Sequence, residues 1–246
     1  MRGYDSTTYG DGFADVYDEW YESVTDVHAT VATTKRLAGP GGTVLELGVG
    51  TGRLAIPLAQ AGLRVVGIDS SQAMLDQLHQ RRSDDLDLDI VCGDMVSDLP
   101  DGPFDACLVA YNTIFNLLDS DDQYRCFAEV ASRLASGGVF IVEAIVPDAD
   151  AEAGTDVTVR SMSADRVVLS VSDHQPGTQR TSGQFIELTE AGGVRLRPWA
   201  IRWTLPSELD QMAEAAGLQL VERFGDMAGA EFDELSNQHV SVYRVA

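Results

Sequence analysis

The feature that most constrains this chain is a short apolar run that turns sharply into a glycine-rich loop. Residues 44–52 read Val-Leu-Glu-Leu-Gly-Val-Gly-Thr-Gly, a helix-like segment follows over 54–61, and Asp69 closes a second apolar run at 65–68. Glycines let the backbone approach a ligand closely, and the first turn of the helix offers free N–H groups. An acid about 20 residues beyond the loop is placed to bind a pair of ribose hydroxyls. This order predicts a nucleotide-type cofactor site at the first β-to-α turn of a doubly wound α/β sheet.

The spacing of the glycines separates two cofactor classes. A dinucleotide fingerprint, G-x-G-x-x-G, that begins at Gly48 and Gly50 requires its third glycine at position 53, where this chain has Arg53. The third glycine is Gly52 instead, and Glu46 lies two residues before the loop, giving acid-x-G-x-G-x-G. With this pattern the chain resembles the class I S-adenosylmethionine (SAM) methyltransferases, in which an acid at the loop suits the ammonium of the SAM tail. A Rossmann oxidoreductase is disfavoured by the same two features, and a structural strand–turn–helix with incidental glycines is the plainest alternative.

Further segments match the same family in the same order. Asp69-Ser70-Ser71 follows the second strand, and Gly93-Asp94 ends a third strand expected at 89–92. Residues 104–110 fit the F-D-x-V strand of the family, and 134–138 fit its L-x-P-G-G turn, with Ala and Ser in place of the variable residue and the proline. The matches together are much more specific than any single one, and the resemblance extends over residues 9 to about 146.

The resemblance implies that SAM is the cofactor and S-adenosylhomocysteine the product. Asp69 is expected to bind the ribose, although it could be only part of a helix N-cap. Met74 is expected to pack on the adenine, or to be plain core. Asp94 is expected to contact the adenine amino group, and the N–H of Met95 the ring. The expected cofactor-binding residues are Tyr17, Glu46, Gly48, Gly50, Gly52, Arg53, Asp69, Ser70, Met74, Gly93, Asp94, Met95 and Ala110.

The catalytic residues are less defined by the sequence. Methyl transfer from a sulfonium is an in-line displacement, and a neutral amine brings its own lone pair, whereas a hydroxyl acceptor needs a base. In the family the loop at 111–116 faces the transferring methyl. Here it is not (N/D)-P-P-Y, so it does not resemble enzymes that act on nucleobase amines. Asn112 and Asn116 are candidates to orient the acceptor or to cap the loop, Tyr21 is a candidate pocket wall, and His174 is a candidate base.

The composition of the chain limits which substrates and which cellular compartment we expect. A net charge of −22 repels phosphate backbones, so nucleic acid is a poor substrate. The three cysteines have no paired spacing, which predicts buried reduced thiols and no metal site. There is no signal-peptide core, and no apolar run approaches the ~20 residues of a membrane span. We therefore expect a cytoplasmic protein that acts on a small molecule, as a monomer or a homodimer.

Patterning predicts three regions. Residues 1–38 form an N-terminal helical cap of two helices, the first with an aromatic stripe from Phe13 to Tyr21. Residues 39–150 and 205–246 form the SAM-binding, Rossmann-like domain. Residues 151–204 form an antiparallel β insertion of three or four strands after strand five, covering the active site.

Within the insertion, the apolar positions change phase near Pro198, which cannot donate to a strand ladder, and this predicts a bulge or bend there. Small-molecule methyltransferases, including glycine and aminosugar N-methyltransferases, carry a similar antiparallel cover. The expected function is therefore SAM-dependent methylation of a small molecule, with an amine as the favoured acceptor. O-methylation of a small natural product and non-catalytic SAM binding are the alternatives.

Overall fold

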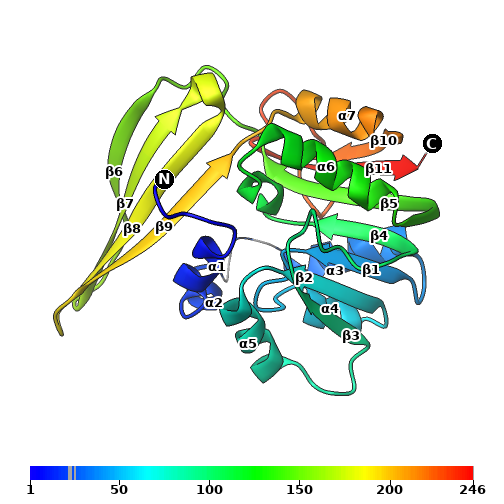
Figure 1. Ribbon diagram of the computed structural model, residues 1–246, viewed down its shortest axis with the longest axis horizontal. Coiled ribbons are helices and arrows are strands. Elements are labelled where there is room, and N and C mark those ends of the chain that lie inside the picture. Colours follow the sequence, from blue (N-terminus) through cyan, green and yellow to red (C-terminus); the bar gives the residue numbers. More distant parts are fainter. Residues whose placement is uncertain (22–23, 25, 246) are drawn as a thin grey trace.

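The computed structural model describes residues 1–21, 24 and 26–245. Its centre is a seven-stranded sheet in the order β10-β11-β5-β4-β1-β2-β3 (Figure 1). The pairs from β3 to β5 are parallel, and β11 and β10 each run antiparallel to their neighbour in the sheet. The predicted doubly wound α/β fold is therefore confirmed. The strands are β1 Thr43–Leu47, β2 Arg64–Asp69, β3 Leu88–Cys92, β4 Phe104–Val109, β5 Leu134–Ile145, β10 Leu218–Phe224 and β11 Gln238–Val245.

Helices cover both faces of this sheet, each over its own apolar core. One core joins the sheet to α6 (Ser120–Ala131) and α7 (Pro206–Ala215). The other joins it to α3 (Val27–Ala38), α4 (Ala55–Gln60) and α5 (Gln72–Arg81). Alternate residues of each strand enter opposite cores, as the pleat requires. No helix in the described part of the chain is long and apolar enough to cross a bilayer.

The N-terminal region differs from its prediction. The aromatic stripe does not lie on one helix, because α1 ends at Phe13 and α2 begins at Tyr17, and the two are separate elements before α3 (α1 Thr8–Phe13, α2 Tyr17–Tyr21). Asp15, in the break, accepts two bonds from Arg197. That partner lies 182 residues away in the sequence, so local periodicity could not reveal it.

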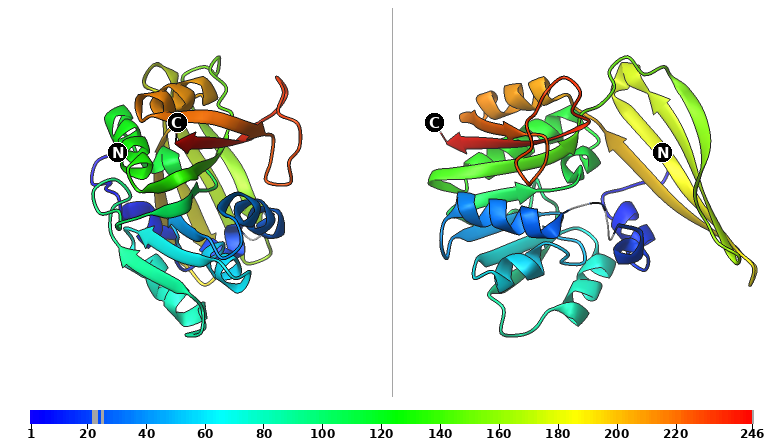
Figure 2. Two further views of the ribbon diagram at one scale, coloured as in Figure 1. Left: turned by 90° about the vertical axis from the view of Figure 1, so that its right-hand side faces the viewer. Right: turned by 180° about the vertical axis from the view of Figure 1, so that it is seen from behind.

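The insertion forms a separate four-stranded antiparallel sheet in the order β6-β7-β8-β9. The sheet stands beside the main body, with α1 and α2 between the two, as the right-hand panel of Figure 2 shows. Its strands are β6 Gly154–Met162, β7 Arg166–Gln175, β8 Arg180–Thr189 and β9 Val194–Arg202.

The bulge predicted at Pro198 is wrong. The β8–β9 register is unbroken from Arg180↔Arg202 to Leu188↔Val194, and Pro198 lies on the edge strand, where no ladder N–H is required. The apolar positions switch from one face of β9 to the other near Pro198 because both faces of this strand carry apolar residues. An irregularity occurs instead in β6, between Val159 and Ser161.

A third apolar core joins the inserted sheet to the N-terminal helices. Phe13 is fully buried and meets Phe185 of β8 edge-on, with ring centroids 5.8 Å apart. Beside it the Arg197 guanidinium, 1% exposed, donates to the Gly12 carbonyl and to the carboxylates of Asp15 and Glu187. A buried arginine with three acceptors fixes the position of α1 on this sheet.

The cysteines follow their prediction in part. Cys107 and Cys126 are buried free thiols in the core beside α6. Cys92 is exposed, because it is the last residue of β3, at the edge of the sheet.

Candidate functional site

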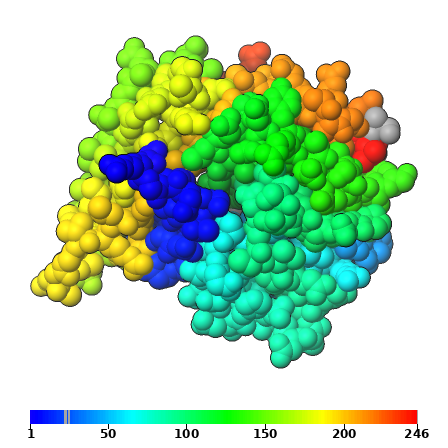
Figure 3. Space-filling model, in the orientation of Figure 1, coloured from blue at the N-terminus to red at the C-terminus, as the bar shows by residue number. Residues whose placement is uncertain are grey.

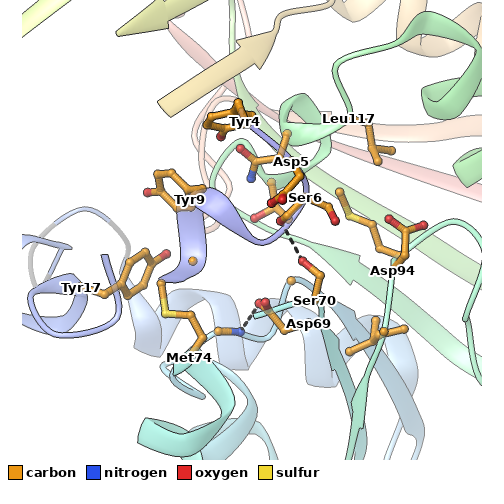
Figure 4. Close-up of a pocket in the computed structure, with 18 residues that line it drawn as sticks. Tyr4, Asp5, Ser6, Tyr9, Tyr17, Asp69, Ser70, Met74, Asp94 and Leu117 are labelled. Atoms are coloured by element: carbon orange, nitrogen blue, oxygen red, sulfur yellow. Dashed lines mark hydrogen bonds between the residues drawn. The ribbon is translucent and has the colours of Figure 1, made fainter. Parts of the chain in front are cut away.

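A cavity lies where the carboxyl ends of β1 to β4 meet the N-terminal segment. It encloses about 750 Å³, counting the open space at its mouth. Figure 3 shows the surface hollowed where the blue N-terminal segment meets the green and cyan parts of the main domain. This edge of an open α/β sheet is where ligands bind in such folds. Eighteen residues line the cavity, and Figure 4 shows them with Asp69 and Met74 on one side and Asp94 and Leu117 on another.

Asp69 joins the glycine loop to the following helix. One carboxylate oxygen accepts the Gly50 N–H at 2.9 Å, and the other accepts the Ser71 N–H at 2.9 Å. Burial raises the pKa of this carboxyl, and the two backbone donors oppose that rise. Each oxygen has a second lone pair, so Asp69 can hold the loop and still accept from a ligand.

The three glycines of the loop have different surroundings. Gly50 has φ +55°, and the nearest atom to a Cβ placed there lies 3.9 Å away, so the cavity begins at its backbone. A Cβ on Gly48 would come within 2.4 Å of Thr113. A Cβ on Gly52 would come within 2.8 Å of Leu78 in α5, and Gly52 does not line the cavity. Gly52 therefore serves the packing of α5 against the loop.

A second cavity adjoins the first at Gly48, Tyr17 and Thr113, which line both. Its charged residues are Glu46, at the end of β1, and Arg53, just before α4. Glu46 is only 4% exposed, and burial raises its pKa to about 8, against the effect of Arg53. Glu46 Oε2 and Arg53 Nε and Nη1 are buried without a hydrogen-bond partner. Buried polar atoms without partners are rare, and here they border empty space that a zwitterion would fill.

Tyr17 and Tyr111 line this second cavity, and they belong to a group of tyrosines that also includes Tyr9 and Tyr21. The Tyr9 hydroxyl donates to Tyr21 at 3.2 Å, the Tyr17 and Tyr21 rings are 4.8 Å apart, and Tyr21 meets Tyr111 edge-on at 5.9 Å. Burial raises the pKa of Tyr9, and it raises the pKa of Tyr17 to about 12. These phenols are therefore neutral at pH 7 and act as hydrogen-bonding groups and apolar walls.

The structure brings together most of the residues named from the sequence. The first cavity is lined by Tyr17, Gly48, Gly50, Asp69, Ser70, Met74, Gly93, Asp94, Met95 and Asn116. The second adds Glu46, Arg53 and Ala110. Gly52 lines neither cavity.

Three candidates for catalysis lie outside both linings. Asn112 has a left-handed backbone, φ +65°, and its Oδ1 accepts the Ile145 N–H at 2.7 Å, so its side chain holds the loop to the end of β5. His174 is the penultimate residue of β7, where Nδ1 lies 2.7 Å from the Thr181 hydroxyl and the ring stacks near Trp203. Tyr21 belongs to the tyrosine group and lines neither cavity.

The sequence reasoning missed the part of the lining that comes from the first residues of the chain. Ser6 accepts a bond from the Ser70 hydroxyl through its carbonyl, and Asp11 accepts one from Ser71 (Figure 4 shows the first). Tyr4 and Tyr9 also line the cavity. Tyr9 begins the segment Tyr9-x-x-x-Phe13-Ala14-x-x-Tyr17-Asp18, which resembles the Y-x-x-x-A-x-x-Y-D opening of the family, and that resemblance could have identified it. The segment around Ser6 has no pattern of its own.

Comparisons with known proteins agree with this geometry. A family model described as a methyltransferase domain matches residues 44–138. The cypemycin N-terminal methyltransferase of a Streptomyces species is 29% identical over 206 residues, 82% of each protein.

Solved structures extend the likeness over the whole chain. The CcbJ methyltransferase of Streptomyces caelestis is 40% identical, with a TM-score of 0.92, over 99% of this chain and 100% of its own. SAM-bound CalS10, an amino pentose methyltransferase of Micromonospora echinaspora, covers 100% of this chain and 93% of its own with a TM-score of 0.64, and at 18% identity it shows the fold alone. The chain belongs to the class I SAM-dependent methyltransferases.

Proposed function

We propose that this methyltransferase transfers the methyl group of SAM to the amine of a small molecule. The observation that carries the proposal is the pair of adjoining cavities. The first offers carboxylates at Asp69 and Asp94 beside apolar side chains, which suits a nucleoside. The second offers an acid and an arginine whose buried polar atoms have no partners, which suits an amino-acid tail.

The residues fit each part of SAM by their chemistry. We assign the ribose hydroxyls to Asp69 and the adenine to Asp94, Met95 and Met74. Asp94 uses Oδ1 to accept the N–H groups of Val96 and Ser97, which leaves Oδ2 for an amino group. We assign the ammonium of the tail to Glu46 and its carboxylate to Arg53, because an arginine pairs well with a carboxylate.

The bound cofactor supplies an electrophilic methyl on a sulfonium. The protein must then hold the acceptor opposite the sulfur, and such positioning can lower a barrier by about 7–11 kcal/mol. Tyr17, which lines both cavities, and Asn116, which lines the first, are the groups we propose for the acceptor side.

The lining favours an amine over a hydroxyl acceptor. Among the described residues that line the two cavities there is no histidine or cysteine, and the phenols of Tyr9 and Tyr17 have pKa values too high for a base at pH 7. Of the four carboxylates in the linings, we assign all but Asp5 to SAM. A neutral amine needs no base, whereas a hydroxyl does. The amine assignment also agrees with the names of the cypemycin N-terminal methyltransferase and of CalS10, an amino pentose methyltransferase.

The test is release of S-adenosylhomocysteine from SAM against matched panels of amines, phenols, carboxylates and short peptides, with cofactor binding measured in parallel. We expect turnover confined to amines, rising with pH as the acceptor loses its proton. Turnover on phenols alone would replace the proposal with O-methylation. Tight SAM binding with no turnover on any panel would contradict the small-amine assignment and leave the cofactor site standing.

A further inference from the structure

The inserted sheet has two faces with different neighbours. One face, with Val168, Phe185 and Arg197, packs on α1 and α2. The other face is made by the residues of opposite phase, and Figure 1 and the right-hand panel of Figure 2 show no described element packed across its outer half. Sheets of this kind commonly bury one face and place polar residues on the other.

The outward positions do not follow that rule. The strand registers align them in three rows that cross all four strands. The rows are Met162-Val167-Leu188-Val194, Val159-Leu169-Ile186-Leu196 and Val157-Val171-Gln184-Pro198. Eleven of these twelve positions are apolar and none is charged, in a chain with net charge −22. We call these twelve residues the outer aliphatic face.

Exposure on this face is concentrated and large. Twelve large apolar side chains are exposed among the described residues, and six of them lie here, from Leu188 at 39% to Met162 at 76%. The single polar member, Gln184, donates to the sulfur of Met1, so the chain's own first residue covers part of the third row. The other two rows, which begin at Met162 and Val159 and lie toward the far end of the sheet, remain exposed.

We propose that the outer aliphatic face is the contact between two copies of this chain, packed sheet on sheet about a two-fold axis. A flat aliphatic face without aromatic projections is complementary to itself, and two such faces interdigitate with strands about 30° apart. Charge supports a second copy as the occupant, because two strongly acidic chains repel each other through most of their surface and can meet where neither carries charge.

The size of the face also fits. Four strands about 4.8 Å apart and three rows about 6.8 Å apart span roughly 20 by 20 Å, or about 400 Å². Two copies together bury about 800 Å² through these positions, which is at the low end for a specific contact and suits a dimer that dissociates on dilution. In the dimer the opposite faces of both sheets remain on their own α1 and α2.

The test is the mass of the intact protein by sedimentation velocity at micromolar concentration. We expect the wild type at twice the chain mass of 26.5 kDa, and Val159→Asp and Leu196→Asp at the chain mass. Leu235→Asp, at a 90% exposed apolar position elsewhere, is the matched control and should stay dimeric. Unchanged SAM binding by each variant would show that it is folded.

A second experiment tests whether the outer aliphatic face of one copy contacts the same face of another copy. Mixing monomeric Val159→Asp with monomeric Val159→Lys should favour a mixed dimer over either variant alone, because the two contacting faces then carry opposite charges instead of like ones. A monomeric wild type would overturn the proposal and leave the face to another partner. A dimer that survives both aspartate substitutions would overturn it too, since the contact would then lie elsewhere.

Discussion

Glu46 and Arg53 line one small cavity and form no ion pair with each other. Glu46 Oε2 and Arg53 Nε and Nη1 are buried without hydrogen-bond partners, although Arg53 is close enough to oppose the rise of the Glu46 pKa. An acid and an arginine held apart in one small cavity suit a ligand that carries both an ammonium and a carboxylate. The cost of burying them is offset when an ammonium and a carboxylate bind between them.

The raised pKa of Glu46 makes stability depend on pH. Between the unfolded pKa of 4.5 and the folded pKa of about 8, the folded chain holds a proton that the unfolded chain has lost. The stabilisation is therefore complete below pH 4.5 and is lost as pH rises toward 8, with a slope of up to about 1.4 kcal/mol per pH unit. Glu46→Gln should flatten this slope in denaturant unfolding of the SAM-free protein. An unchanged slope would contradict the assignment.

The same group links SAM binding to proton release. An ammonium beside Glu46 favours the carboxylate, so binding between pH 6 and 8 should release a fraction of a proton. Calorimetry in buffers of different ionisation enthalpy measures that fraction directly. We expect release by the wild type and none from this site in Glu46→Gln, which should also bind more weakly. Equal release by the two proteins would show that Glu46 does not titrate on binding.

Arg53→Met should weaken binding of S-adenosylhomocysteine by one to two orders of magnitude, because a charge-assisted bond contributes about 1.5–3 kcal/mol. Affinity for 5′-methylthioadenosine, which has no amino-acid tail, should be nearly unchanged. The comparison separates loss of a tail contact from damage to the pocket. An equal loss for both ligands would mean that Arg53 supports the fold of the site instead.

Asp69→Ala should reduce affinity for both of those ligands, since both carry the ribose. The variant loses an acceptor for the ligand and also the bonds to the Gly50 and Ser71 N–H groups, so a loss of at least tenfold is expected by calorimetry. Asp76→Ala is the control, because Asp76 is exposed on α5, the helix that follows Asp69, and its carboxylate accepts from Gln72 alone in the bonds of the described residues. Intact affinity in folded Asp69→Ala would refute the ribose assignment.

Arg197→Met should destabilise the protein by about 3 kcal/mol, because it leaves the Glu187 carboxylate, 11% exposed, without its buried partner. Arg195→Met removes an ion pair to the same Asp15 from a side chain that is 55% exposed, and it should cost under about 1 kcal/mol. Denaturant unfolding of the two variants measures the difference. Equal losses of unfolding free energy in the two variants would show that the burial of Arg197 does not determine how much it stabilises the fold.

The sequence predicted those elements whose cause is local. The strands at Thr43–Leu47 and Leu218–Phe224 have the predicted bounds, and the glycine loop ends at the predicted cavity. The break between α1 and α2 was missed because it depends on Asp15 meeting Arg197 from a distant strand. The bulge predicted at Pro198 was wrong because a proline is tolerated in an edge strand, and which strand lies at the edge depends on the arrangement of the whole sheet. The lining around Ser6 was missed because its contact with Ser70 is tertiary.

The inserted sheet shares no strand ladder with the seven-stranded sheet, and it has an apolar core of its own with the N-terminal helices. Residues 154–202 can therefore diverge in evolution without breaking a strand pairing of the cofactor half. Selection for the cofactor site and selection for the surface of the inserted sheet therefore act on separate strand pairings. Exchange of this segment between relatives is thus a rational route to hybrid proteins that keep the seven-stranded sheet intact.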